Sequence, residues 1–152
     1  MVGAVILMIV SSAGCLGSGA PKVDLSSVKC SESLVPGQNM TINETQNNAT
    51  ICAKLNSSMM IELPDPTRMG GEWTMTASPG LQLTDEGLIV QFFDVNGTSV
   101  QGPSNGPGIV TYTHAWNVTM TGTGVQTLKG DTQFPGRSSS PVPAFNLTIV
   151  VE

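Results

Sequence analysis

Hydrophobic and polar residues alternate with a period of two along most of the chain after residue 38, as they do in half-buried β-strands. No run of helical length shows the 3.6-residue period of an amphipathic helix. The segment 88–93, LIVQFF, is almost continuously apolar and predicts a more fully buried strand. The predicted inward residues are Met40 and Ile42; Ala49, Ile51, Ala53 and Leu55; Met59, Ile61 and Leu63; Trp73, Met75 and Ala77; Val110, Tyr112, His114, Trp116, Val118 and Met120; and Phe145, Leu147, Ile149 and Val151.

Turn signals separate these segments. Asn96-Gly97 is a strong tight-turn signal, and Gly130 interrupts a weaker strand over residues 125–134. About seven or eight short strands within about 110 residues predict an all-β protein with a β-sandwich over residues 39–152.

The N-terminal segment differs in character. Residues 2–10 are nearly all apolar, fewer than the roughly 20 that span a bilayer, and are typical of a signal-peptide core. Ser12, Ala13 and Gly14 then lead into Cys15, which resembles a lipobox, where cleavage exposes a cysteine for lipidation. We therefore expect a signal-peptide-like segment at 1–14 and a lipid-attached tether at 15–38. No lysine or arginine precedes the apolar run, and a short uncleaved anchor is the alternative.

The chain has three cysteines, an odd number for a secreted protein. A lipidated Cys15 leaves Cys30 and Cys52, whose disulfide would close a loop of about 22 residues and stabilise the fold by about 3 kcal/mol. The alternative is two free thiols. Because Cys52 is predicted to point outward, the segment around Cys30 should cross the outer surface of its strand or lie at its edge.

Asparagine occurs in Asn-x-Ser/Thr sequons unusually often, and this predicts N-glycosylation of a surface protein. In the alternating strands the sequon asparagine always falls on the polar face, which supports the register. Polar strands rich in Asn and Thr are the compositional alternative. A lipobox beside many sequons is typical of an archaeal protein that is lipid-anchored at the cell surface. The sequons are at Asn39, Asn43, Asn48, Asn56, Asn96, Asn117 and Asn146.

The composition argues against several functions. A net charge of −5 disfavours nucleic-acid binding, and a single histidine rules out a His-rich metal site. His114 falls on the core-facing stripe and is predicted to be a hydrogen-bonded structural residue; alternation separates it from Cys52, so the two should not form a nucleophile pair. We expect no enzymatic activity and no cofactor.

The segment 62–73, ELPDPTRMGGEW, joins two predicted strands by a long loop with two prolines and two glycines. With SPGLQLTDEG at 78–87, THAWNVTMTGTGVQTLK at 113–129 and FNLTIVVE at 145–152, it resembles the chagasin-type inhibitors of papain-like cysteine peptidases. The resemblance covers roughly residues 41–151. It implies an immunoglobulin-like sandwich in which three loops at one end fill the peptidase cleft.

Carried onto this sequence, the resemblance implies three inhibitory loops. Arg68 and Met69 stand where the family has two threonines, and the family's third-loop Arg-Pro-aromatic motif is not present. The alternative function is therefore a structural or adhesive cell-envelope module, a lipoprotein or filament subunit that contacts neighbouring surface proteins. The candidate inhibitory residues are Pro66, Thr67, Arg68, Met69 and Gly70 in the first loop, Asn105, Gly106 and Gly108 in the second, and Phe134 and Pro135 in the third.

Overall fold

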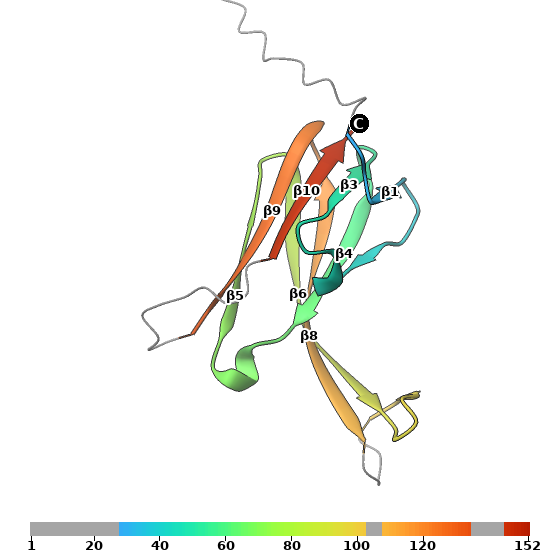
Figure 1. Cartoon of the computed structure of the whole chain (residues 1–152), viewed down its shortest axis with the longest axis vertical. Helices are drawn as coiled ribbons and strands as arrows, with labels where there is room; N and C mark the ends of the chain where they lie inside the picture. Colours follow the sequence, from blue (N-terminus) through green and yellow to red (C-terminus); the bar gives the residue numbers. More distant parts are fainter. Residues whose placement is uncertain (1–27, 103–107, 135–144) are drawn as a thin grey trace, which may run out of the picture.

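The structure is a computed structural model that describes residues 28–102, 108–134 and 145–152 (Figure 1). These residues form two five-stranded β-sheets packed face to face, with two short 3-10 turns and no α-helix among them. The predicted all-β sandwich is confirmed. It contains more strands than the alternation predicted, because three strands of two or three residues lie at sheet edges.

The first sheet has the strand order β1-β3-β10-β9-β5. Its centre is β10, whose sequence FNLTIVV is rich in β-branched residues that suit a buried strand. β10 pairs in parallel with β3 and antiparallel with β9. The strands are β1 (Glu32–Leu34), β3 (Thr50–Ala53), β10 (Phe145–Val151), β9 (Gly124–Gln133) and β5 (Glu72–Ala77).

The second sheet has the order β2-β4-β8-β6-β7. β8 pairs antiparallel with β4 on one side and with β6 on the other, so it forms the middle of this sheet. The strands are β2 (Thr41–Ile42), β4 (Ser58–Pro64), β8 (Ile109–Met120), β6 (Leu81–Phe93) and β7 (Ser99–Val100).

Alternate residues of both sheets point inward and form one core, which confirms the register of most predicted strands. Trp73, Met75 and Ala77 of β5 are half-buried and pack against this core. The buried apolar residues include Ile42, Ile51, Ala53, Met59, Ile61, Leu63, Trp116, Val118, Met120, Leu128, Phe145, Leu147, Ile149 and Val151.

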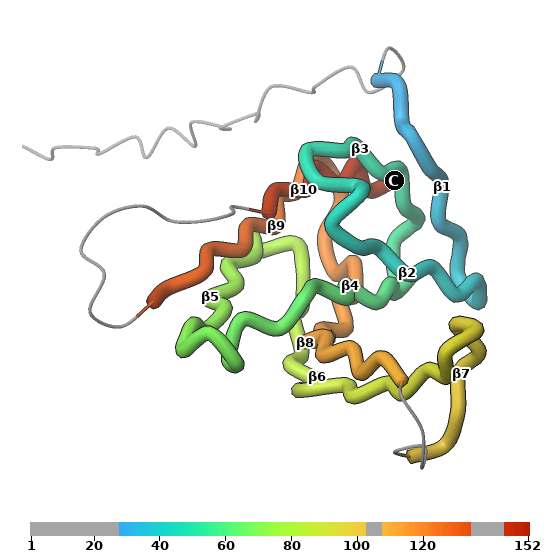
Figure 2. Tube along the Cα trace, turned by 60° about the horizontal axis from the view of Figure 1, so that its bottom comes forward, coloured from blue at the N-terminus to red at the C-terminus, as the bar shows by residue number. Residues whose placement is uncertain are grey.

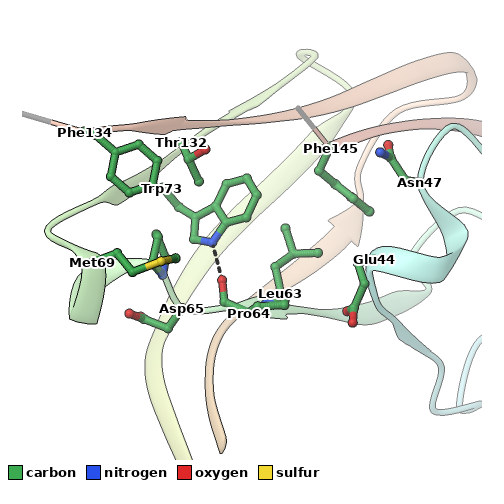
Figure 3. Close-up of a pocket in the computed structure, with 11 residues that line it drawn as sticks. Glu44, Asn47, Leu63, Pro64, Asp65, Met69, Trp73, Thr132, Phe134 and Phe145 are labelled. Atoms are coloured by element: carbon green, nitrogen blue, oxygen red, sulfur yellow. Dashed lines mark hydrogen bonds between the residues drawn. The ribbon is translucent and has the colours of Figure 1, made fainter. Parts of the chain in front are cut away.

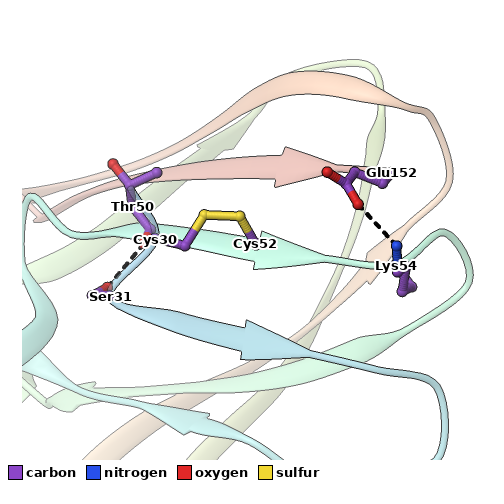
Figure 4. The surroundings of a disulfide bond; sticks show 6 residues. All are labelled: Cys30, Ser31, Thr50, Cys52, Lys54 and Glu152. Carbon is purple, nitrogen blue, oxygen red and sulfur yellow. Dashed lines mark hydrogen bonds and ion pairs between the residues drawn. A yellow bond between two sulfur atoms is a disulfide. The ribbon is translucent and has the colours of Figure 1, made fainter. Parts of the chain in front are cut away.

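The predicted disulfide between Cys30 and Cys52 is present, with Cα atoms 5.5 Å apart (Figure 4). β1 follows Cys30 directly and pairs in parallel with β3, so the crossing segment lies at the sheet edge. Leu34 of β1 is buried in the core. The prediction of a tether through residue 38 is therefore wrong for β1, because a buried leucine and a cross-linked edge strand hold this part in the sandwich; residues 15–27 lie outside the described residues.

The prediction that LIVQFF is a buried strand is also wrong. β4 ends at Pro64, paired with Thr113, and the rest of β8 continues beyond it beside β6 alone. Figures 1 and 2 show this hairpin projecting past the body of the sandwich. Val90, which lies beyond the end of β4 and pairs with Tyr112, is 40% exposed, and Leu88, which pairs with His114, is 50% exposed. The residues of β8 that were predicted to face inward are also more exposed along the hairpin than in the core. Val110 is exposed, and Tyr112 and His114 are half-buried.

Leu55, predicted inward, is exposed. β3 ends at Ala53 and the chain turns at Asn56, whose φ of 64° lies in the left-handed region, so Leu55 falls outside the alternation. None of the seven sequon asparagines is buried. Asn43, Asn117 and Asn146 are half-buried and the other four are exposed. Their glycosylation stays a prediction.

Candidate functional site

The loop between β4 and β5 is a compact structure without strand pairing. Its centre is the 3-10 turn η3 (Thr67–Met69), which begins at the buried Pro66 and ends at Gly70. Gly70 has φ of 75°, a left-handed conformation that suits glycine at a turn end. The amides of Met69 and Gly71 both donate to the carbonyl of Pro66, at 2.9 and 3.1 Å.

A buried carboxylate anchors the start of this loop. Asp65 has a side chain only 1% exposed, and its Oδ1 accepts hydrogen bonds from the amide of Thr67, at 2.7 Å, and from the Thr67 hydroxyl. The backbone amide of Asp65 donates to the carbonyl of Tyr112 on β8, at 2.9 Å. Charge-assisted hydrogen bonds of this kind are among the stronger contacts available to a loop.

His114 connects this anchor to the neighbouring strand. Its Nδ1 lies 3.5 Å from Asp65 Oδ2, its Nε2 lies 2.7 Å from Asp85 Oδ1, and its ring stacks on Trp116 at 4.4 Å between centroids. The hydrogen bond from His114, with a smaller contribution from the amide of Gly87, lowers the pKa of Asp85 below its ordinary value of 3.8. His114 is thus the predicted hydrogen-bonded residue, at the loop end of the core.

Two aromatic contacts hold the flanks of the loop. Trp73 Nε1 donates to the carbonyl of Pro64 at 2.9 Å, across the two ends of the loop. The guanidinium of Arg68 lies 4.6 Å from the centroid of the Tyr112 ring, within the range of a cation–π contact. The loop is therefore fixed from both strands that flank it and from β8.

The outer surface of the loop is formed by Met69, which is 75% exposed. On the inner side, Gly71 packs directly against the ring of Phe134 at the end of β9: a Cβ at position 71 would lie 2.5 Å from Phe134 Cε1. Only a glycine fits there without displacement. The first and third candidate loops are therefore in contact at this end of the sandwich.

A cleft of about 460 Å³ lies between this loop and the end of the two sheets (Figure 3). Its walls are largely apolar: Trp73, Phe134 and Phe145 contribute rings, and Leu63 and Met69 contribute aliphatic chains. Glu44 of the 3-10 turn η2 (Glu44–Gln46) lines it from the opposite side.

The structure does not group all predicted site residues. Pro66 to Gly70 and Phe134 lie together, whereas Gly108 stands at the start of β8, at the far tip of the projecting hairpin. Figures 1 and 2 both show that tip apart from η3. Asn105, Gly106, Pro135 and the lipidation candidate Cys15 lie outside the described residues.

Sequence reasoning missed the residues that hold the loop in place. Asp65 is the clearest case, since Asp65-Pro66-Thr67 is a recognisable signal for an aspartate capping its own turn. No local sequence pattern predicts the contact between Asp65 and His114, because the two residues are 49 positions apart (114 − 65 = 49).

Neither a metal-binding cluster nor a membrane-spanning helix occurs in the described residues. Within residues 28–102, 108–134 and 145–152, no three His, Cys, Asp or Glu side chains are grouped so that they could bind a metal ion. In the same part of the chain, no helix is long and apolar enough to cross a membrane.

The fold and the loop define a class: a two-sheet β-sandwich that presents a stiff loop at one end. No protein-family model and no curated protein matches the sequence. Among solved structures, the chain is similar to the crystal structure of the cysteine protease inhibitor EhICP2 from Entamoeba histolytica, with a TM-score of 0.54 at 11% sequence identity; the match covers 82% of this chain and 100% of that chain. It is also similar to the solution structure of Amebosin, with a TM-score of 0.53 at 20% identity, over 76% and 100% of the two chains.

These similarities show the fold. The chain has the chagasin-like β-sandwich expected from its sequence. At 11% and 20% sequence identity, the similarity extends to the fold alone.

Proposed function

We propose that this domain inhibits papain-like cysteine peptidases by inserting the β4–β5 loop, together with the adjoining Phe134, into the active-site cleft. The observation that carries the proposal is the loop itself: an irregular segment fixed by a buried aspartate, with Met69 75% exposed at its outer surface. A loop that is already ordered loses little conformational entropy when it docks.

The chemistry of the loop fits this role. Pro64 and Pro66 have fixed φ angles, and the exposed Gly70 allows the backbone close approach to a partner. A 3-10 turn cannot lie extended along a peptidase cleft as a substrate does, so the loop can occupy the cleft without presenting a bond for cleavage. Arg68 and Met69 provide the exposed side chains through which contact energy is concentrated.

We further propose that the inhibitor acts from the cell surface. Cys15 would carry the lipid, residues 1–14 would direct export, and the seven sequons would carry glycans. None of the sequons falls within residues 62–73 or at Phe134, whereas Asn43 adjoins Glu44 at the other wall of the cleft. Replacing Cys15 with serine should release the protein from the membrane fraction; mass spectrometry that finds no lipid on the mature N-terminus would contradict this part.

The test of inhibition is direct. The protein is incubated with papain, and hydrolysis of a fluorogenic substrate is followed over a range of inhibitor concentrations. We expect inhibition at micromolar concentration or below, and Met69→Ala should weaken it about tenfold or more. Val95→Ala is the matched control, because Val95 is similarly exposed, at 69%, on the hairpin. Absence of inhibition across a panel of papain-like peptidases would refute the proposal.

A second candidate is a structural or adhesive surface module. Exposed apolar residues on one face of the β6–β8 hairpin, Leu88, Val90 and Val110, favour it, because monomeric proteins seldom expose such a group without a contact. Sedimentation velocity distinguishes the two: self-association abolished by Leu88→Ser, without peptidase inhibition, would support the module.

A further inference from the structure

The cleft beside η3 has the properties of a small-molecule site. Its volume of about 460 Å³ falls within the roughly 300–1,000 Å³ typical of ligand pockets. It lies between Trp73, Phe134 and Phe145, so three aromatic side chains face one space (Figure 3). Aromatic rings recognise flat apolar molecules through offset and edge-to-face contacts.

One polar group in the wall has no partner. Thr132 of β9 is 4% exposed, and its Oγ1 is the one buried side-chain polar atom in the described residues that makes no hydrogen bond. Such an atom is unfavourable because it has lost water without gaining a partner. Thr132 lines the cleft opposite Trp73, its cross-strand neighbour. Rotation about χ1 between staggered positions can turn the hydroxyl toward a ligand without backbone movement.

The charge of the cleft limits what it accepts. Glu44 and Asp65 both line it, and no lysine or arginine does so among the described residues. The Asp65 carboxylate is already bonded to Thr67 and faces His114, whereas Glu44 is exposed. The negative charge of Glu44 would therefore repel an anionic ligand, whereas a neutral ligand has no charge to be repelled.

We infer that this cleft binds a small neutral aromatic molecule that carries one hydrogen-bonding group. The ring lies among Trp73, Phe134 and Phe145, and the polar group pairs with Thr132 Oγ1. This binding goes beyond the proposed inhibition because it needs no peptidase, and Met69 and Phe134 border both surfaces.

The test compares three probes of similar shape on the full ¹⁵N-labelled chain. Benzyl alcohol, toluene and benzoate are titrated while the indole N–H signal of Trp73 and the amides of residues 65–71 are followed by NMR. We expect saturable shifts with benzyl alcohol in the millimolar range that suits so few atoms. Toluene should bind about 3- to 10-fold more weakly than benzyl alcohol, because it cannot form the hydrogen bond. Benzoate should bind at least as weakly as toluene, because it is an anion.

Variants then assign the preference to one atom. Thr132→Val removes the hydroxyl at nearly constant shape and should abolish the preference for benzyl alcohol over toluene. Thr132→Ser keeps a hydroxyl at this position and should retain the preference. Thr127→Val is the matched control, because Thr127 lies on the same strand and is exposed. The inference is overturned if no probe gives saturable shifts at the cleft, or if Thr132→Val keeps the preference. Both outcomes are read without a peptidase, so they are independent of the proposed inhibition.

Discussion

The β4–β5 loop and the β6–β8 hairpin project from the same end of the sandwich but are ordered in opposite ways. The hairpin is regular, with β6 paired to β8 from Leu81 to Phe93, yet before Thr113 the described part of β8 pairs with no strand other than β6. The loop has no strand pairing, yet Asp65, Pro66 and Gly71 are all buried or packed against other elements.

The difference shows that backbone regularity and tertiary anchoring are separate sources of order. A two-stranded ribbon on its own is marginally stable in water. The loop gains its order from side chains, through the capping of Thr67, the contact with His114 and the Trp73–Pro64 hydrogen bond. Substitutions in the loop should therefore cost more than equivalent substitutions in the hairpin.

The largest contrast lies along β8, which belongs to both the core and the hairpin. Trp116→Ala should lower the free energy of unfolding by about 3–5 kcal/mol, because Trp116 is buried against Trp73 and His114. Val110→Ala, six positions earlier on the hairpin, should cost about 0.5 kcal/mol or less (116 − 110 = 6). Urea denaturation measures both. Equal costs would mean that the hairpin is covered in solution.

The next contrast compares two aspartates that cap turns. Asp65→Ala should cost about 2–3 kcal/mol, because it removes a buried carboxylate that accepts from Thr67 and faces His114. Asp94 accepts from the amides of Asn96 and Thr98 in the turn between β6 and β7, at 2.8 and 2.9 Å, and Asp94→Ala should cost about 1 kcal/mol. Amide hydrogen exchange should show faster exchange over residues 65–71 in the first variant alone. Uniform exchange in both would contradict the anchoring role of Asp65.

Two glycines offer a third contrast. Gly71→Ala should cost about 1–3 kcal/mol, because the new Cβ would overlap the Phe134 ring. Gly97→Ala should cost about 1 kcal/mol through its φ of 78° alone, since no atom lies within 4 Å of the added Cβ. The two mechanisms separate in double mutants: Phe134→Ala should offset part of the cost of Gly71→Ala and none of the cost of Gly97→Ala. Additivity in both pairs would argue against contact between the loop and Phe134.

The smallest effect concerns pH. Because the pKa of Asp85 is lowered by its hydrogen bond with His114, ionised Asp85 adds stability at pH values above 3.8, and this is lost as the pH falls through the lowered pKa. Asp85 is largely exposed, so the contribution is small. Asp85→Asn should flatten the decline of the melting temperature in this acid range. In a His114→Gln background the same substitution should have little further effect; an equal effect would exclude His114 as the cause.

The sequence by itself determined the parts of the protein that depend on alternation and covalent chemistry. Apolar residues at every second position place Ile61, Trp116 and Ile149 inward under any arrangement of the two sheets, because a shift of one residue would expose them all. The Cys30–Cys52 bond followed from the cysteine count with Cys15 assigned to lipidation, and the outward position of Cys52 placed the Cys30 segment at the outer surface or edge of the sheet. The stiffness of residues 64–71 followed from their prolines and glycines.

Only the tertiary structure decided where the pairing of β4 with β8 ends and the projecting hairpin begins. LIVQFF is as apolar as a buried strand, yet Val90 is exposed where β8 no longer pairs with β4. The anchoring of Asp65 by His114 and the cleft that contains Thr132 also depend on contacts between distant segments. Local sequence specifies which face of a strand is apolar. Chain topology determines which elements cover that face, and the residues that topology brings together show no periodic pattern in the sequence.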